Sequence, residues 1–449
     1  MRLALFVLGA LLLGSASARA FEWLPGVPLT RQGALLIYDD EPFAAVGVNK
    51  HELLDQYMAD LLGSTAERAD EARAAAEQSL KGLADLGVSV IRVRASGFWP
   101  AQIERTYLHE DPQVRQAFWQ AFDAMLDDCD RYGIRVVLTI AWHLGGWADL
   151  AHESLTDLFT DSRSQSRQML DKWVEDLVSR YRQRDTVLLW ELTNESNLSA
   201  DLRPMFADKG CLSPHLDKPA PHIVKGPIIR DGRNNYSSDE LAALTRDLAR
   251  FIKSIDPDRL VGTGFSAPRP AAWHLWLGSI RKTDKMDWTQ DTPEQAADYL
   301  RLVSPDPVDV ISLHTYGSEF ERMLNFKLAA DSIGKPVYVG EIGASGGVFG
   351  EPVYDSPAAV KAFGILLAAM REMGIPISLA WTWDEWGKPV HEPVLRPEAQ
   401  PDVVQTLRQA NEAAAGQAGQ PALDEDGLHL RMQELTAQFQ ALQPPKEDK

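Results

Sequence analysis

Two glutamates in this chain stand where an apolar, strand-like run meets a polar loop. Glu195 follows Asn194 and the run Thr186 to Thr193, and Glu341 closes the run Lys335 to Gly340. A carboxylate at such a position is poorly placed for core packing and well placed for chemistry at one rim of a sheet or barrel. The pair indicates an acid and a nucleophile.

Strand-like runs alternate with amphipathic helical segments between residue 35 and residue 415. Alternation of this kind predicts βα units and a parallel sheet. Several runs follow a helix through a Gly or Pro turn, as at Leu86-Gly87 and Tyr132-Gly133. The eight runs are Ala44 to Asn49, Ser89 to Arg94, Arg135 to Ala141, Thr186 to Thr193, Arg259 to Thr263, Val308 to His314, Pro336 to Glu341 and Ile377 to Trp383.

Eight βα repeats in one continuous series favour a closed (β/α)8 TIM barrel over an open doubly wound sheet. The end of the first run and the two residues after it, Val46-Gly47-Val48-Asn49-Lys50-His51, lack the glycine spacing that lets a backbone approach a pyrophosphate. In a barrel of this type the polar residues that end the strands converge on one face. We therefore expect one catalytic domain, residues 21–415, with its active site at the strand ends.

Two long loops are expected on the active-site rim of this domain. Residues 196–237 follow the fourth run and are rich in Pro, Lys, Gly and His, and residues 384–401 follow the eighth run. Residues 416–449 are predicted to form a linker and a flexible tail around one short helix. That helix is marked by Leu428, Met432, Leu435 and Phe439.

The first twenty residues are typical of a secretory signal peptide. They combine the positive residue Arg2, an apolar stretch from Leu3 to Leu13, and the small-residue site Ala18-Arg19-Ala20. The apolar stretch is well short of the roughly 20 residues needed to span a bilayer. We expect a secreted or periplasmic protein with no membrane span in its mature form.

The net charge of the chain restricts the class of its partners. A formal net charge of −19 argues against nucleic acid and anionic membranes, because both attract basic surfaces. A neutral substrate fits better.

Cys129 and Cys211 could form a disulfide in an oxidising compartment, but Cys129 lies on a helical pattern of apolar residues and is interpreted as a core residue.

Polar and aromatic residues end the other runs as well: Arg92, His143, His314, Tyr316 and Trp381. Together with the glutamates, their motifs resemble glycoside hydrolase family 5, the cellulase and mannanase family of the large retaining-glycosidase clan built on (β/α)8 barrels. The matching motifs are Gly87-Val88-Ser89-Val90-Ile91-Arg92, Trp190-Glu191-Leu192-Thr193-Asn194-Glu195, Ser312-Leu313-His314-Thr315-Tyr316 and Val339-Gly340-Glu341-Ile342-Gly343.

The resemblance implies distinct roles for the two glutamates. Glu195 would be the acid/base and Glu341 the nucleophile of a retaining mechanism, which needs carboxyl groups about 5 Å apart. Asn194 would hydrogen-bond the sugar 2-hydroxyl, Tyr316 would hold the nucleophile, and His314 would tune the acid/base.

Arg92 resembles the arginine that supports the nucleophile through a charge-assisted hydrogen bond. Arg94 stays an alternative, because it is two residues on and points to the same face. Trp381 resembles the platform under the sugar at the cleavage point, with Trp383 as the second choice. His143 stands where the family often carries a sugar-binding histidine.

Thirteen tryptophans are many for this length. Aromatic faces stack on pyranose rings, so the tryptophans expected on the rim are interpreted as sugar subsites. They are Trp99, Trp142, Trp147, Trp273, Trp276, Trp288, Trp381, Trp383 and Trp386.

A metal site built from His51, His143 and His314 lacks support, because no His-x-x-x-His pair and no carboxylate at ligand spacing accompanies them. We expect no metal and no other cofactor.

The sequence thus predicts an exported, retaining glycoside hydrolase that cleaves β-linked glycans of the β-mannan or β-glucan type by double displacement. Its partner would be a poly- or oligosaccharide. Two alternatives stay open. One is an exo-acting β-glycosidase or transglycosylase that acts on oligosaccharides or on a bacterial exopolysaccharide. The other is a non-catalytic carbohydrate-binding barrel.

Overall fold

The computed structural model describes residues 21–202, 235–283, 285–343, 356–384, 386, 395, 398, 400–415 and 423–442. The predicted signal peptide, most of the loop 196–237 and Cys211 lie outside the described residues. Most of the loop 384–401 and the ends of the C-terminal tail lie outside them too.

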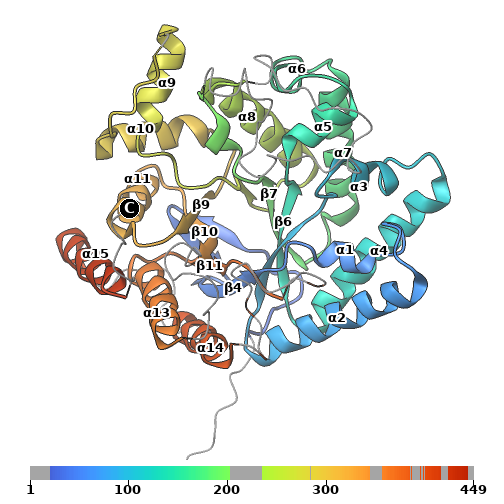
Figure 1. Ribbon diagram of the computed structural model, residues 1–449, viewed down its shortest axis with the longest axis horizontal. Coiled ribbons are helices and arrows are strands. Elements are labelled where there is room, and N and C mark those ends of the chain that lie inside the picture. The colour runs from blue at the N-terminus through green and yellow to red at the C-terminus, as the bar shows by residue number, and fades with distance from the viewer. Residues whose placement is uncertain are drawn as a thin grey trace, which may run out of the picture.

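Eight parallel strands form one sheet that closes into a (β/α)8 barrel (Figure 1), and the predicted fold is confirmed. The strands are hydrogen-bonded in the order β8-β7-β6-β5-β4-β11-β10-β9. A parallel bridge between Gly262 and Val310 joins the two ends of this order. The strands are β4 (Ala45–Asn49), β5 (Val90–Arg94), β6 (Arg135–Ala141), β7 (Val187–Thr193), β8 (Val261–Gly262), β9 (Ile311–Tyr316), β10 (Val337–Gly343) and β11 (Ile377–Ala380).

Helices surround the barrel, and each strand leads to one that returns the chain to the opposite end (Figure 1). These returning helices are α2 (Ala66–Asp85), α4 (Pro112–Arg131), α7 (Gln165–Tyr181), α8 (Ser238–Ile255), α10 (Pro293–Val303), α11 (Phe320–Ser332), α13 (Pro357–Glu372) and α14 (Pro401–Ala415). Shorter helices follow the strand ends, namely α1 (Leu53–Tyr57), α3 (Pro100–Arg105), α5 (Leu144–Leu150), α6 (Leu155–Thr160), the 3-10 turn η1 (Ser196–Ser199) and α9 (Ala272–Arg281).

The helix-to-strand turns fix where the strands begin. Gly87 after α2 and Gly133 after α4 have φ of 77° and 67°, a left-handed conformation that glycine adopts without strain. After Gly87, the amide of Val88 donates a 3.0 Å hydrogen bond back to the carbonyl of Leu83. The chain therefore leaves the helix sharply and enters the next strand within three residues.

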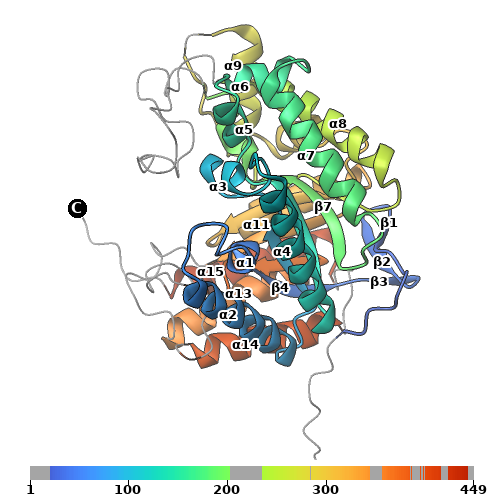
Figure 2. The ribbon, with the colours of Figure 1, turned by 90° about the vertical axis from the view of Figure 1, so that its right-hand side faces the viewer.

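A small antiparallel sheet that the sequence pattern did not predict lies beside the barrel (Figure 2). Its strands are β1 (Thr30–Gln32), β2 (Leu35–Tyr38) and β3 (Glu41–Pro42), which are too short to show a clear alternation. Leu36, Tyr38 and Phe43 pack in one apolar cluster with Val90 and Val137 from the barrel strands. This sheet therefore covers the end of the barrel where the strands begin.

The C-terminal helix α15 (Glu425–Gln440) buries Leu428, Met432, Leu435 and Phe439, the same four residues that marked it in the sequence. Phe439 packs edge-on against Phe320 of α11, with ring centroids 6.0 Å apart. Cys129 on α4 is fully buried in the core, as its helical pattern predicted, and within the described part of the chain it is a free cysteine.

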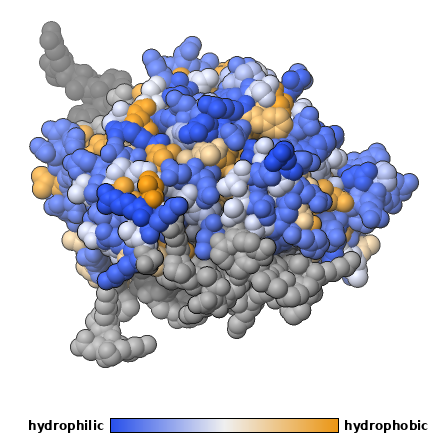
Figure 3. Space-filling view, turned by 90° about the horizontal axis from the view of Figure 1, so that it is seen from above, coloured by the Kyte–Doolittle hydropathy of each residue, from blue (hydrophilic) through white to orange (hydrophobic). Residues whose placement is uncertain are grey.

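The face seen in Figure 3 is mainly hydrophilic, with apolar side chains scattered among polar ones. Within the described part of the chain, no helix has the length and apolar character needed to cross a membrane.

Candidate active site

The predicted site residues gather where the barrel strands end. A parallel barrel brings the carboxyl ends of its strands to one rim, so residues far apart in the chain become neighbours. Arg92 lies in β5, His143 after β6, Asn194 and Glu195 after β7, His314 and Tyr316 in β9, Glu341 in β10 and Trp381 after β11.

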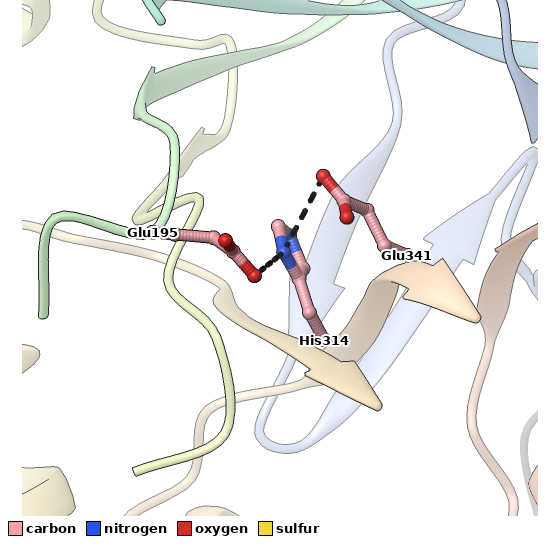
Figure 4. A group of neighbouring side chains, drawn as sticks. All are labelled: Glu195, His314 and Glu341. Carbon is pink, nitrogen blue, oxygen red and sulfur yellow. Dashed lines mark hydrogen bonds and ion pairs between the residues drawn. The ribbon is translucent and has the colours of Figure 1, made fainter. Parts of the chain in front are cut away.

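His314 stands between the two glutamates (Figure 4). Its Nδ1 lies 3.1 Å from Oε1 of Glu195 and 3.5 Å from Oε1 of Glu341. One carboxylate oxygen of Glu195 and one of Glu341 lie within 4.8 Å of each other. Retaining glycosidases hold their two carboxyl groups about 5–5.5 Å apart, whereas inverting enzymes leave a wider gap for water.

Glu341 is held by a donor on each oxygen. Nη1 of Arg92 donates to Oε1 at 2.8 Å, and the hydroxyl of Tyr316 donates to Oε2. Although 37% of Tyr316 is exposed, burial around its hydroxyl and the charge of Glu341 raise its pKa well above the usual value. Tyr316 therefore stays protonated and acts as a donor, which favours a charged, oriented Glu341.

Arg92 is the centre of the hydrogen-bond network, and it is fully buried. Besides Glu341, its guanidinium donates to Asn194 Oδ1 at 2.7 Å and to Asn49 Oδ1 at 3.1 Å. Burial alone would lower its pKa, but the charges of Glu191 and Glu341 outweigh it and raise the pKa overall. Arg92 is therefore a permanent cation that fixes both a carboxylate and the amide of Asn194.

Glu191 is a site residue that the sequence analysis missed. It lies four residues before Glu195 in β7 with no exposed surface. Nε of Arg92 donates to its Oε1 at 2.8 Å, and the hydroxyls of Thr139 and Tyr338 donate to it as well. The available signal was a charged residue inside an otherwise apolar strand run, because such a residue must be paired.

The backbone of Glu195 is turned so that its side chain faces the strand ends. Its φ is 51°, and its amide donates a 2.8 Å hydrogen bond to the carbonyl of Gly264. Gly264 itself has a φ of 73°, and a Cβ there would lie 1.7 Å from the carbonyl oxygen of Thr193. Only glycine fits at residue 264, so the loop after β8 can hold Glu195 in place.

Aromatic rings form one wall beside the carboxylates. The ring of His51, from the loop after β4, is stacked on Trp381 with centroids 4.8 Å apart and planes 16° apart. Trp142 lies 6.1 Å from Trp381, and the guanidinium of Arg92 lies 4.6 Å from the Trp142 ring. Trp381 is thus backed by the stacked ring of His51, a contact that the sequence analysis did not predict.

Three of the tryptophans expected on the rim are buried instead. Trp142 is 3% exposed, Trp383 is 1% exposed and Trp147 is fully buried. Trp383 was the second choice for the sugar platform because it would share a strand face with Trp381. β11 ends at Ala380, so the alternation of a strand does not extend to residue 383.

Arg92 and Arg94 have different hydrogen-bond partners in the structure. The guanidinium of Arg94 donates to the carboxylate of Asp55 and to the carbonyl of Ser96, the latter at 2.9 Å. The donor to Glu341 is Arg92, as the resemblance implied.

His143 caps the start of α5, and its ring packs against Phe98 with centroids 4.7 Å apart. Trp99 lies beyond, 6.4 Å from the His143 ring. The histidine and the two aromatic residues form a second cluster, on the loops after β5 and β6.

Glu195, His314 and Glu341 are close enough that their geometry alone would also suit a metal ion. Their oxygens and nitrogen already take part in contacts within the site, and Arg92 places a positive charge directly beside Glu341. A cation would be repelled by that guanidinium. The absence of a metal cofactor stays a prediction.

Comparisons with known proteins identify two relatives by sequence. Two proteins of Oryza sativa subsp. japonica, named mannan endo-1,4-beta-mannosidase 8 and 7, are each 24% identical to the chain, over 70% of its length and 78% and 77% of theirs. No protein-family model matches the chain.

Solved structures share the fold. An endo-1,4-beta-mannanase from Rhizomucor miehei aligns with a TM-score of 0.60 and 14% identity, over 87% of this chain and 99% of its own. A family 5 mannosidase from the same organism aligns with a TM-score of 0.55 and 15% identity, over 93% and 99%. The resemblance to glycoside hydrolase family 5 is confirmed.

The structure shows how the residues that carry the family 5 resemblance contact one another. It joins Arg92, Tyr316 and His314 to Glu341, and it joins His314 to Glu195. The chemical roles of these residues stay predictions.

Proposed function

We propose that the protein is a retaining glycoside hydrolase that cleaves β-linked glycans by double displacement, with Glu195 as acid/base and Glu341 as nucleophile. The observation that carries the proposal is the spacing of the two carboxylates, whose nearest ligand oxygens lie within 4.8 Å. Such a gap suits direct attack by one carboxylate and leaves too little room for the water of an inverting enzyme.

In the first step, an oxygen of Glu341 attacks the anomeric carbon from one face of the sugar ring. The bond between that carbon and the glycosidic oxygen breaks, and the oxygen takes the proton of Glu195. The shortened chain leaves with a new hydroxyl. The other fragment is bound to Glu341 as an ester.

In the second step, Glu195 is a carboxylate and takes a proton from water. The water oxygen attacks the anomeric carbon, the ester bond to Glu341 breaks, and the carboxylate of Glu341 is restored. Two inversions give net retention at the anomeric carbon. One water is consumed, and both glutamates return to their starting states.

The neighbours of the glutamates suit these steps. Arg92 and Tyr316 orient Glu341 for attack and stabilise it as it leaves. Nδ1 of His314 lies 3.1 Å from Oε1 of Glu195, so the histidine is in contact with the carboxyl group that loses and regains the proton. Asn194 is fixed through its side-chain oxygen by Arg92, so its amide nitrogen is the atom available to donate to a sugar hydroxyl.

We propose β-1,4-mannan, cleaved within the chain, as the substrate. The support is the pair of rice relatives, named mannan endo-1,4-beta-mannosidases, and the similarly named Rhizomucor miehei structure. The Trp381 platform suits a pyranose ring without choosing among sugars. We also propose export, on the evidence of the signal-like residues 1–20.

The test is a panel of polysaccharides with product sizing. Purified protein without residues 1–20 is incubated with β-1,4-mannan, galactomannan, β-glucan, xylan and bacterial exopolysaccharides, beside the Glu341→Ala variant. We expect oligosaccharides of several lengths from mannan, produced only by the unmodified enzyme. Single sugars alone would instead indicate exo action. An inactive protein that still binds these polymers would indicate a carbohydrate-binding barrel.

A further inference from the structure

A second carboxylate shares the guanidinium that holds the nucleophile. Glu191 and Glu341 both accept from Arg92, at 2.8 Å each, and Nη2 of Arg92 lies 2.7 Å from Oε1 of Glu191. Arg92 and Glu191 are fully buried, whereas the side chain of Glu341 is 6% exposed. The mechanism proposed above leaves Glu191 without a role.

Donors from three other strands surround the carboxylate of Glu191. Thr139 in β6 donates to Oε1 at 2.5 Å, and Tyr338 in β10 donates to Oε2. Burial and the charge of Glu191 raise the pKa of Tyr338 well above its usual value, so this hydroxyl remains a donor. A buried charge is costly, so its presence beneath the site calls for a function beyond packing.

We propose that Glu191 is a positioning residue that acts through Arg92 and limits how strongly the guanidinium holds Glu341 during the reaction. This inference rests on the proposed function, because it assigns Glu341 as the nucleophile.

The charge balance among Arg92, Glu191 and Glu341 supports this role. Before reaction, Arg92 faces two carboxylates, so the trio of Arg92, Glu191 and Glu341 has a net charge of −1. Once Glu341 is an ester, Glu191 still neutralises the buried guanidinium. Without the charge on Glu191, Arg92 would bind the free Glu341 more strongly and would be left unpaired in the intermediate. Both effects raise the barrier to attack.

Other ionisable groups face the same trio and stay in place in the test. Glu341 meets His314 and Tyr316 from β9 and, across the site, Glu195. Among the described residues, Tyr338 of β10 is the ionisable side chain other than Arg92 that hydrogen-bonds Glu191. A change confined to Glu191 therefore alters one charge in the network.

The experiment is the pH profile of kcat/KM for an activated aryl β-glycoside, measured on Glu191→Gln and the unmodified enzyme. The acidic limb of this profile reports the essential base of the free enzyme. We expect that limb to move to lower pH by about one unit, the order expected when a like charge near a carboxylate is removed. We also expect kcat/KM to fall about tenfold.

Two matched variants separate charge from shape. Tyr338→Phe removes a hydrogen bond from Glu191 and keeps its charge, and Glu191→Asp keeps the charge on a shorter side chain. Both should leave the acidic limb near that of the unmodified enzyme, even where kcat falls. If Glu191→Gln does not fold, Glu191→Asp remains as the test of the proposal. Because this variant keeps the charge, an acidic limb that shifts by a full unit would overturn the proposal.

An unmoved or upward-shifted acidic limb in folded Glu191→Gln would overturn it as well. A different result would show that the proposed function itself is wrong: Glu341→Ala would then keep its activity. Far-ultraviolet circular dichroism and thermal melting of each variant establish that the protein compared is folded.

Discussion

Nη1 of Arg92 donates a 2.8 Å hydrogen bond to Oε1 of Glu341. This bond joins β5 to β10 across the mouth of the barrel, and it links a fully buried cation to the carboxylate assigned as nucleophile. Because the same guanidinium also binds Glu191 and Asn194, it couples the stability of the barrel to the geometry of the site.

Replacement of Arg92 should therefore damage stability and activity together. Arg92→Ala leaves Glu191 buried without its cation, and breaking a buried pair in this way costs about 3–5 kcal/mol. Arg92→Lys keeps the charge but loses the fork that reaches several partners, so it should be more stable than Arg92→Ala and still nearly inactive. Urea denaturation and kcat/KM measure the two effects, and an Arg92→Ala protein of unchanged stability would contradict the buried network.

Removal of Glu341 should abolish turnover while the fold remains. In Glu341→Ala, azide can occupy the space of the lost carboxylate and attack an activated β-glycoside from the nucleophile's face. The product should be a glycosyl azide of inverted configuration, identified by nuclear magnetic resonance. Activity like that of the unmodified enzyme, without azide, would exclude Glu341 as the nucleophile.

Removal of Glu195 should give the opposite stereochemistry in the same assay. Glu195→Ala still forms the ester on Glu341 when the leaving group needs little protonation, and azide then attacks from the other face. We expect a glycosyl azide of retained configuration, and a much smaller loss of rate with aryl glycosides than with natural glycans. Equal losses on both substrate types would argue against an acid/base role.

Sequence patterns could predict most of the barrel because each strand is a run of apolar residues followed by a polar end. The predicted runs around β6 and β10 differ from the observed strands by at most two residues at either end. The run Arg259 to Thr263 shrinks to two residues in β8. The N-terminal sheet was missed because three-residue and four-residue strands carry no readable period.

The site was predictable where a residue stands at a strand end and resembles a family motif. Glu191 and His51 were missed because their importance depends on partners from other strands: Arg92 for the former and Trp381 for the latter. Trp383 was misjudged because the strand ends three residues earlier than the predicted run. A charge inside an apolar run marked Glu191 as a residue that must be paired, but the local sequence does not show which residue pairs with it.

Tyr316→Phe should lower activity and shift one side of the pH profile. Its hydroxyl donates to the charged Glu341, and hydrogen bonds to charged groups contribute about 1.5–3 kcal/mol, so kcat should fall roughly 10-fold to 100-fold. Without this donor the charged form of Glu341 is less favoured, so the acidic limb should move to higher pH.

The alkaline limb should stay in place in Tyr316→Phe, because burial and the charge of Glu341 raise the pKa of Tyr316 well above its usual value. Tyr316 therefore does not titrate in the working range of the enzyme. The measurement is kcat/KM from acid to alkaline pH, and loss of the alkaline limb in the variant would contradict this role.

As the nucleophile, Glu341 should form a covalent ester with the sugar, and this ester can be trapped. A 2-deoxy-2-fluoro β-mannoside with a good leaving group slows both steps, and the slower hydrolysis of the ester lets it accumulate. Mass spectrometry of the intact protein and of its peptides then locates the label. We expect one added fluorosugar on the peptide that contains Glu341. A label on Glu195 or Glu191, or inverted products from the natural substrate, would contradict it.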